Sequence, residues 1–347
     1  MKKLLLCLSL TLLLCGCGNS KTTSASSKET ELDKYSTQVF AMDTVMDISI
    51  FAEDDTLLSD ASSLVTDLEK KLSTTDKNSE VYKLNETKDA FLSDDSADIL
   101  ERALEFCSKT EGALDLSIYP VVRAWGFTTD SFQVPSKTEI DTLLANVDYT
   151  KISYSKEDKH VTLPEGMEID LGSVAKGYTG DKLVEFFKGN GITSALLNLG
   201  GNVQALGSKP DGTPWKIAVK SPDDRTDYLG VLSIVDSAVI TSGGYERYFE
   251  DEDGNIYWHI IDPSTGTPAK NGIISATAIG PEGTYCDALS TSLFIMGAKK
   301  AEDFWRTYKD FDMILVTDED EVIITPGIKS TFELMPNSPY HVTVIEE

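Results

Sequence analysis

The stretch DLGSVAKGYTGD (residues 170–181) organises the rest of this chain. It follows a strand-like run and opens a helix with an apolar stripe through residues 183–187. Near its start it offers Asp170, Gly172 and Lys176. Backbone N–H groups and the dipole at a helix N-terminus favour anions, and a lysine adds positive charge. The stretch therefore suits a phosphate or a metal–phosphate pair. The alternative is that the glycine simply forms a turn between the strand and the helix, with no ligand-binding role.

The N-terminus has the pattern of a secretory signal. MKK (residues 1–3) precedes an apolar run at residues 4–14, which is too short to span a bilayer. LCGC (residues 14–17) resembles a bacterial lipobox with Cys17 as the lipidated residue, and an ordinary cleaved signal is the alternative. We expect a lipoprotein signal peptide at 1–16, a Ser/Thr/Lys-rich tether at 17–34 and one folded domain at 35–347. The protein is then exported and lipid-anchored to the outer face of the bacterial cell membrane.

The charge of the chain limits its partners. It has 31 Lys and Arg against 57 Asp and Glu, a formal net charge of −26. Such a surface repels nucleic acid and anionic lipid, so we expect no nucleic-acid partner and membrane contact through the lipid anchor only. An anionic ligand needs local positive charge or a divalent cation here.

Cysteine and histidine usage narrows the kind of metal site. Beyond the N-terminal segment only Cys107 and Cys286 remain, far apart, which does not resemble a disulfide scaffold or a thiolate site. The three histidines, His160, His259 and His341, argue against a multi-histidine zinc site. A metal here would be held by oxygen, which points to Mg²⁺ or Ca²⁺.

The order of helical and strand-like segments predicts an α+β fold with mixed, mostly antiparallel sheets and packed helices in a single large domain. Residues 38–51 alternate like a strand or a bent pair of strands, and DEDG (251–254) marks a hairpin. Helical spacing is found at residues 57–72, 96–109, 136–144, 287–296 and 298–308. Further strands are expected at residues 151–155, 159–163, 193–199, 203–206, 215–220, 231–235, 238–241, 245–250, 256–262, 273–279, 313–316, 321–325 and 341–345.

Asp115 stands in the otherwise apolar, strand-like run TEGALDLSIYP (residues 110–120). A carboxylate in such a run is costly to bury unless it is hydrogen-bonded or contacts a ligand. The alternative is an outward-facing residue of an alternating strand.

Asp287 and Thr291 lie four residues apart in a predicted helix, so their side chains share one helix face. A carboxylate and a hydroxyl, with a backbone carbonyl from elsewhere, make a partial shell for Mg²⁺ completed by phosphate oxygens and water. The simpler alternative is that Asp287 caps the helix and Thr291 faces solvent.

HIIDPSTGTP (residues 259–268) places His259 and Asp262 on one expected strand before a rigid turn. Alternation puts these two side chains on opposite faces, so they are not a same-face dyad. Asp262 before Pro263 equally suits a turn-forming role. TSGGY (residues 241–245) supplies another glycine-rich polar turn that could approach a ligand.

Together these blocks resemble the ApbE family of FAD:protein FMN transferases, over nearly all of residues 38–300. AMDT (41–44) resembles the family's Met-Gly-Thr segment, with Asp43 in place of glycine. Residues 110–127 resemble its Asp-Gly-x-Phe-Asp…Pro…Trp-Gly-Phe block, and 170–181 its Asp-Leu-Gly…Ala-Lys-Gly block. Residues 198–202, 238–245, 259–268 and 286–297 follow in the family's order.

The resemblance implies an enzyme that binds FAD with Mg²⁺, cleaves its pyrophosphate, and transfers FMN to a Thr or Ser hydroxyl of an exported target protein while AMP leaves. By motif position, Mg²⁺ would be held by the Ser173 backbone oxygen, the Asp287 carboxylate and the Thr291 hydroxyl. FAD contacts would fall on Met42, Ala113, Asp115, Asp170, Lys176 and Ile261. Asp43 adds a side chain beside the Met42 contact.

The incoming hydroxyl needs a proton acceptor. His259 is the candidate base by its intrinsic pKa, with Asp287 as the rival if it is not committed to metal. Two alternative functions remain open: an FAD pyrophosphatase that gives FMN and AMP, and a non-catalytic flavin-binding lipoprotein. The chain contains no Asp-Gly-x-(Ser/Thr)-x-x-Thr acceptor pattern, so we do not expect it to be its own main target.

Overall fold

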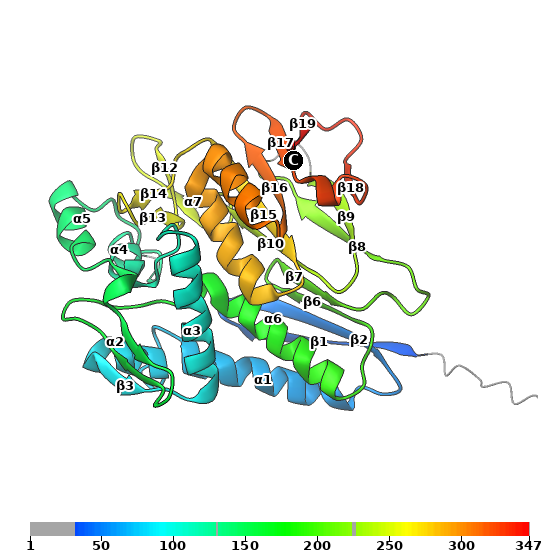
Figure 1. Cartoon of the computed structure of the whole chain (residues 1–347), viewed down its shortest axis with the longest axis horizontal. Coiled ribbons are helices and arrows are strands. Elements are labelled where there is room, and N and C mark those ends of the chain that lie inside the picture. Colours follow the sequence, from blue (N-terminus) through cyan, green and yellow to red (C-terminus); the bar gives the residue numbers. More distant parts are fainter. Residues whose placement is uncertain (1–31, 130, 224–226, 347) are drawn as a thin grey trace, which may run out of the picture. The chain divides into compact units, whose positions relative to one another are not determined.

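A nine-stranded sheet forms the centre of the molecule (Figure 1). The computed structural model describes residues 32–129, 131–223 and 227–346. The expected signal peptide, Cys17 and nearly all of the expected tether lie outside these residues. The first strand begins at Asp33, slightly before the expected start of the domain.

Neighbouring strands of this sheet are antiparallel, apart from the parallel pair β17 and β19 at one edge. Together with the packed helices this makes the fold α+β, as expected. In spatial order the strands are β1 (Asp33–Ala41), β2 (Thr44–Ala52), β6 (Ala195–Leu199), β7 (Asn202–Leu206), β10 (Ala238–Gly243), β15 (Ile273–Gly280), β16 (Asp312–Thr317), β17 (Glu321–Ile324) and β19 (His341–Val344).

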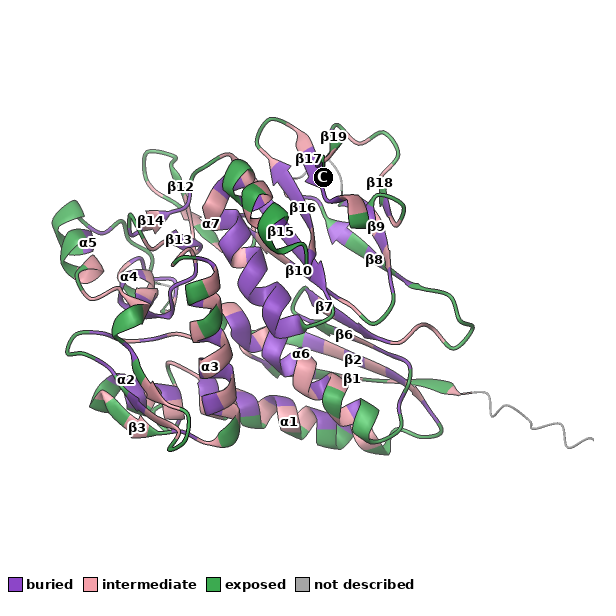
Figure 2. Cartoon of the chain, in the orientation of Figure 1, coloured by how far each residue is buried: buried purple, intermediate pink, exposed green. Residues whose placement is uncertain are grey.

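Both faces of the large sheet are covered, and its central strands are largely buried (Figure 2). Helices α1 (Thr56–Leu72), α6 (Gly172–Gly189) and α7 (Gly283–Tyr308) cover one face. A smaller sheet of β18 (Phe332–Leu334), β9 (Tyr228–Ile234) and β8 (Trp215–Lys220) packs on the other. Strand β10 illustrates the alternation, because Ala238 and Ile240 pack with the α7 side and Val239 packs with the small sheet.

The remaining elements stand at the other end of the helical layer (Figure 1). They are the helices α2 (Glu80–Thr87), α3 (Asp94–Lys109), α4 (Tyr119–Ala124) and α5 (Lys137–Leu144), the 3₁₀ helices at Leu116–Ile118 and Tyr149–Lys151, and the strands β3 (Asp89–Phe91), β4 (Ser153–Ser155), β5 (His160–Thr162), β11 (Tyr248–Glu250), β12 (Ile256–Trp258), β13 (Ile261–Asp262) and β14 (Thr267–Pro268). A further 3₁₀ helix, Pro326–Ile328, lies between β17 and β18 and packs with the small sheet.

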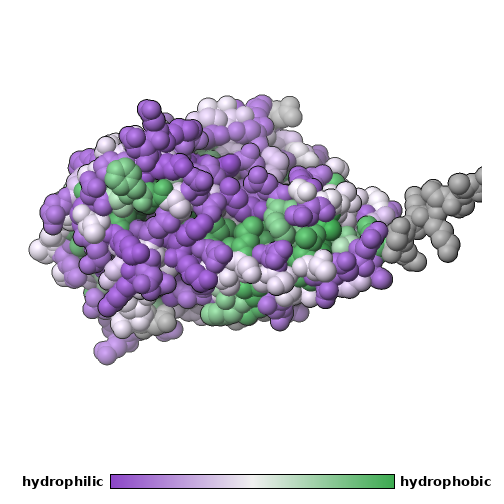
Figure 3. All heavy atoms as spheres, turned by 90° about the horizontal axis from the view of Figure 1, so that it is seen from below, coloured by the Kyte–Doolittle hydropathy of each residue, from purple (hydrophilic) through white to green (hydrophobic). Residues whose placement is uncertain are grey.

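The surface seen from below is largely hydrophilic, with apolar residues in separate patches (Figure 3). Among the described residues, no helix has both the length and the apolar character needed to cross a membrane.

Two sequence-based expectations about the backbone are confirmed. The alternating segment at residues 38–51 is a bent pair, the β1–β2 hairpin, which turns at Met42 and Asp43. The expected break between the last two helical segments is a kink in α7 at Gly297, whose φ of 76° is far from helical.

Three other expectations from the sequence, about the secondary structure around Asp115, His259 and Asp287, are wrong. The run containing Asp115 is not a strand, because its carboxylate caps the 3₁₀ helix Leu116–Ile118. Residues 256–262 are two short strands, β12 paired with β11 and β13 paired with β14, so His259 lies between them. Helix α7 starts at Gly283, which places Asp287 one turn inside the helix and not at its cap.

Candidate functional site

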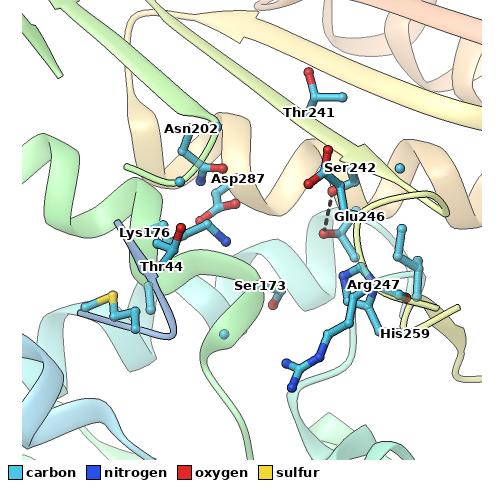
Figure 4. Close-up of a pocket in the computed structure, with 18 of the residues that line it drawn as sticks. Thr44, Ser173, Lys176, Asn202, Thr241, Ser242, Glu246, Arg247, His259 and Asp287 are labelled. Atoms are coloured by element: carbon cyan, nitrogen blue, oxygen red, sulfur yellow. Dashed lines mark hydrogen bonds between the residues drawn. The ribbon is translucent and has the colours of Figure 1, made fainter. Parts of the chain in front are cut away.

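One cavity of about 690 Å³ opens beside the N-terminal ends of α6 and α7 (Figure 4). This volume lies within the usual range for a small-molecule or cofactor site. Every sequence-predicted site residue among the described residues lines it, from five separate parts of the chain. These residues are Met42, Ala113, Asp115, Asp170, Ser173, Lys176, His259, Ile261, Asp287 and Thr291.

Helix α6 brings Ser173 and Lys176 to the cavity from its first turns. The chain enters the helix through an Asx turn, in which the Gly172 N–H donates to Asp170 Oδ1 at 2.9 Å. No hydrogen bond or ion pair joins Lys176 Nζ to another described residue. Its positive charge is therefore directed at the cavity of a strongly acidic protein, which suits an anionic ligand.

Helix α7 contributes Asp287, which is 5% exposed. Its Oδ2 accepts a hydrogen bond from the Gly177 N–H of α6 at 2.8 Å. In a regular helix this N–H pairs with the Ser173 carbonyl, so Asp287 meets α6 at the turn that carries that carbonyl. Burial raises the pKa of the Asp287 carboxyl, while the Lys176 charge and the Gly177 N–H act in the opposite direction.

Thr291 follows Asp287 by one turn on the same face of α7. Its Oγ1 lies 3.2 Å from Ser242 Oγ on β10, which also contacts Ser290 Oγ at 2.8 Å. The alternative in which Thr291 faces solvent is therefore wrong. The side chain lies between α7 and the sheet and lines the cavity.

These groups fit Mg²⁺. The described residues contain no cluster of three or more His, Cys, Asp and Glu side chains able to hold a metal ion. The available donors are one buried carboxylate, one hydroxyl and the carbonyl of Ser173, and Mg²⁺ commonly completes such a partial set with substrate phosphates and water. A bound cation would also lower the pKa of the Asp287 carboxyl, which burial raises, and would so favour the ionised form.

His259 lies at the other side of the cavity, between β12 and β13 (Figure 4). Its Nδ1 is 3.2 Å from the Arg247 carbonyl, and the Phe127 ring meets it edge-on. Donation from Nδ1 to that carbonyl leaves Nε2 as the lone-pair nitrogen. Burial lowers the pKa of His259 to about 4, with the positive charges of Lys176 and Arg247 acting in the same direction, so the imidazole is neutral near pH 7.

Asp115 and Asp170 also line the cavity. Asp115 is buried, and it accepts hydrogen bonds from the Ser117 N–H, the Ser117 hydroxyl and the Tyr149 N–H. The outward-facing alternative for Asp115 is therefore wrong. Burial raises the pKa of both carboxyls, and their hydrogen bonds to N–H groups oppose this shift. Asp262 does not line the cavity, because its carboxylate accepts from the N–H and hydroxyl of Ser264 and shapes the turn.

The β1–β2 turn lines the cavity with Met42 and Asp43. Met42 and Asp43 both have positive φ, 50° and 59°, which a two-residue turn of type I′ requires. The Met42 N–H donates to Glu69 Oε1 of α1 at 2.7 Å. Asp43 thus occupies a conformation that glycine adopts at lower cost.

Several lining residues were not predicted from the sequence. They come from the start of β2, from α1, from the start of β7, from the end of β8 and from the segment that follows β10. The AMDT segment and the polar turns at residues 200–202 and 241–245 were the available signals, whereas nothing local marks Glu69 or Lys220. These residues are Thr44, Glu69, Asn202, Lys220, Glu246 and Arg247.

Known proteins resemble this chain over most of its length, including all the segments that line the cavity. The sequence pattern of the ApbE family matches residues 42–315. A relative from Escherichia coli K12 named FAD:protein FMN transferase is 31% identical over 271 residues, 75% of this chain and 77% of the relative. One of the same name from Treponema pallidum is 33% identical over 246 residues, 66% of this chain and 67% of the relative.

Solved structures agree with the sequence comparison. The crystal structure of the ApbE protein from Thermotoga maritima superposes with a TM-score of 0.77 at 30% identity, covering 83% of this chain and 95% of that protein. The flavin transferase ApbE from Vibrio cholerae has a TM-score of 0.75 at 24% identity and supports the fold alone. This chain belongs to the ApbE family.

Proposed function

We infer that this chain is a Mg²⁺-dependent FAD:protein FMN transferase that links FMN to a Thr or Ser hydroxyl of an exported target protein and releases AMP. The observation that carries this proposal is the convergence of Lys176, Asp287 and His259 on one cavity. A cation for phosphate, a carboxylate suited to a metal, and a neutral base are the groups that phosphoryl transfer requires. The names of the relatives agree with it.

The bond changes are those of an in-line displacement. The acceptor hydroxyl oxygen forms a bond to the phosphorus of the FMN half of FAD, and the bond from that phosphorus to the bridging oxygen breaks. The bridging oxygen leaves with AMP, and the hydroxyl proton passes to a base. The enzyme does not supply the nucleophile, so its residues position the FAD and manage charge.

Each side chain then has a defined task. Lys176 and the N–H groups at the start of α6 stabilise negative charge on the phosphate oxygens. His259 Nε2, neutral at pH 7, takes the proton of the hydroxyl. Mg²⁺, held by Asp287, Thr291 and the Ser173 carbonyl, would supply further positive charge at the phosphates.

The lipid anchor at Cys17 belongs to the same proposal. A tethered enzyme at the outer face of the cell membrane would meet target proteins during or after their export. The anchor predicts that wild-type protein labelled with palmitate is recovered in membranes, whereas Cys17→Ser is not.

The decisive experiment incubates the protein with FAD, Mg²⁺ and candidate exported FMN-binding proteins, followed by mass analysis of each candidate. A gain of one FMN at a Thr or Ser supports the transferase. Asp287→Asn should abolish the gain, whereas Asp262→Asn, which changes a carboxylate outside the cavity, should retain it.

The same assay without a target protein separates the alternatives. AMP release at catalytic turnover in that sample would favour an FAD pyrophosphatase. Retained FAD, with no AMP in any sample, would favour a flavin carrier.

A further inference from the structure

Helix α7 begins without a cap of its own. Glu282, the residue before its first turn, makes no side-chain capping hydrogen bond, and the first turn contains no acidic residue. The N-terminus of a helix exposes unpaired N–H groups and a partial positive charge, which usually require a nearby acceptor.

Asp181 of α6 supplies that acceptor from another helix. Its Oδ1 accepts from the Gly283 N–H at 2.6 Å, and its Oδ2 accepts from the Thr284 N–H at 2.8 Å and the Thr284 hydroxyl at 2.6 Å. Gln204 Nε2 of β7 donates to Oδ1 at 2.8 Å and orients the carboxylate. One side chain therefore satisfies the first two N–H groups of α7.

The two helix backbones touch at this point. A Cβ on Gly177 would lie 2.2 Å from the Gly283 carbonyl oxygen and 2.7 Å from Asp287 Cβ. A Cβ on Gly283 would lie 2.6 Å from the Gly177 carbonyl oxygen. Gly177 and Asp181 are one turn apart on the same face of α6, so the contact and the cap form a continuous seam.

This seam leads directly to the site. Asp287 lies about one turn beyond Gly283 and is bonded to the Gly177 N–H, and Thr291 lies one turn further. On α6, Lys176 lies about one and a half turns before Asp181, and Ser173 lies slightly more than two turns before it. A rotation or slide of α7 on α6 would therefore separate the carboxylate and hydroxyl of α7 from the carbonyl and ammonium of α6.

We propose that Asp181 is the positioning residue of this site: by capping α7 from α6 it sets where Asp287 and Thr291 stand relative to Ser173 and Lys176. The effect of Asp181 on a metal site rests on the proposed function, whereas the cap itself is a feature of the fold. Asp181 does not line the cavity, so its effect on a ligand passes through α7. Groups that orient metal ligands commonly change metal affinity by about 10- to 100-fold when they are replaced.

The test compares Asp181→Asn with Asp98→Asn. Asp98 of α3 accepts from Tyr178 Oη of α6 at 2.9 Å and pairs with Arg102, which also contacts Glu282 just before α7. Its loss therefore weakens the hold on α6 and on that pair, but leaves the hydrogen bonds from α7 to Asp181 in place. Thr284→Val, which removes only the hydroxyl donor, is a milder second variant in case Asp181→Asn does not fold. Mn²⁺ titration followed by electron paramagnetic resonance, with saturating FAD, measures the metal site without turnover.

We expect Asp181→Asn to weaken Mn²⁺ binding by about 10-fold or more, Thr284→Val to weaken it less, and Asp98→Asn to leave it unchanged. Hydrogen exchange at the Gly283 and Thr284 amides should accelerate in Asp181→Asn without metal or FAD. Wild-type Mn²⁺ affinity in Asp181→Asn, or an equal loss in Asp98→Asn, would overturn the positioning role, and unchanged amide exchange would overturn the cap. Failure of the wild type to transfer FMN would count against the proposed function alone, because the exchange measurement does not depend on it.

Discussion

The backbone N–H of Gly177 donates to the carboxylate of Asp287 at 2.8 Å, joining two residues that are 110 positions apart. This bond brings together the two blocks that the sequence marked as halves of a phosphate and metal site. It exists because Gly177 has no side chain, which lets α7 approach the backbone of α6.

Replacing Gly177 with Ala should therefore damage both stability and the site. The new Cβ would meet backbone at 2.2 Å, so the helices must separate. Overpacking of this kind costs about 1–3 kcal/mol. Gly189→Ala in the same helix is the matched control, since a methyl group there would have no atom within 4 Å and alanine favours helix by about 0.5–1 kcal/mol. Urea denaturation measures the free energy of unfolding of both variants. Equal effects of the two substitutions would contradict the close backbone contact of α6 and α7 at Gly177.

The oxygen ligands should differ in their importance. Asp287→Asn removes the only buried anion of the proposed metal set, so Mg²⁺ affinity should fall by more than about 100-fold, beyond the range typical of outer-shell partners. Thr291→Val removes a neutral ligand and should weaken Mg²⁺ less. The Mg²⁺ dependence of FMN transfer measures this order. Thr307→Val, on the same helix with its hydroxyl bonded to the Asp303 carbonyl, should have no effect.

The pH dependence of transfer should reflect a histidine with a lowered pKa. The profile of kcat/KM reports groups of the free enzyme, so its acid limb should fall near pH 4 and not near the ordinary value of 6.5. His259→Ala should reduce transfer by about 10²- to 10⁴-fold while FAD still binds. An inflection near pH 6.5 that disappears in the variant would show that burial does not control this group.

The same residue should make stability depend on pH. The folded state holds His259 neutral down to about pH 4, whereas the unfolded chain binds the proton near 6.5. The unfolded state therefore takes up more protons between these values, and the free energy of unfolding falls as pH falls from 6.5 to 4. His259→Gln should lack this component. Parallel denaturation curves of the two proteins across this window measure it, and an identical pH dependence would contradict it.

The β1–β2 turn should tolerate only particular residues at position 43. Asp43 has a φ of 59°, where a residue with a Cβ is strained by about 1–2 kcal/mol. Asp43→Gly should relieve this strain and offset most of glycine's own entropic cost of about 0.5–1 kcal/mol. Asp43→Val should destabilise, because a β-branched residue fits this conformation poorly. Thermal unfolding of the Asp43→Gly and Asp43→Val variants shows whether each substitution stabilises or destabilises the fold. Asp47→Gly in β2 is a control that we expect to destabilise.

Much of the fold follows from local patterns. The helical spacing of residues 57–72 and the alternation of residues 38–51 reflect near neighbours, so α1 and the β1–β2 hairpin were predictable. The glycine at position 297 likewise marks the kink of α7 by its own conformation. The run around Asp115 was wrongly predicted as strand-like, because an apolar run of this length is compatible with a strand and only the donors of Ser117 and Tyr149 select the cap.

Local sequence patterns were enough to identify the residue types available for the chemistry: a lysine after a glycine turn, a carboxylate and hydroxyl one helical turn apart, and a single histidine before a rigid turn. That these groups share one cavity follows from the packing of the folded chain and from no local pattern. It also decided that α7 begins at Gly283, because its cap is a carboxylate of α6 that no local pattern reveals. Hydrogen bonds between residues more than a hundred positions apart depend on how the helices pack, and packing is a property of the whole chain.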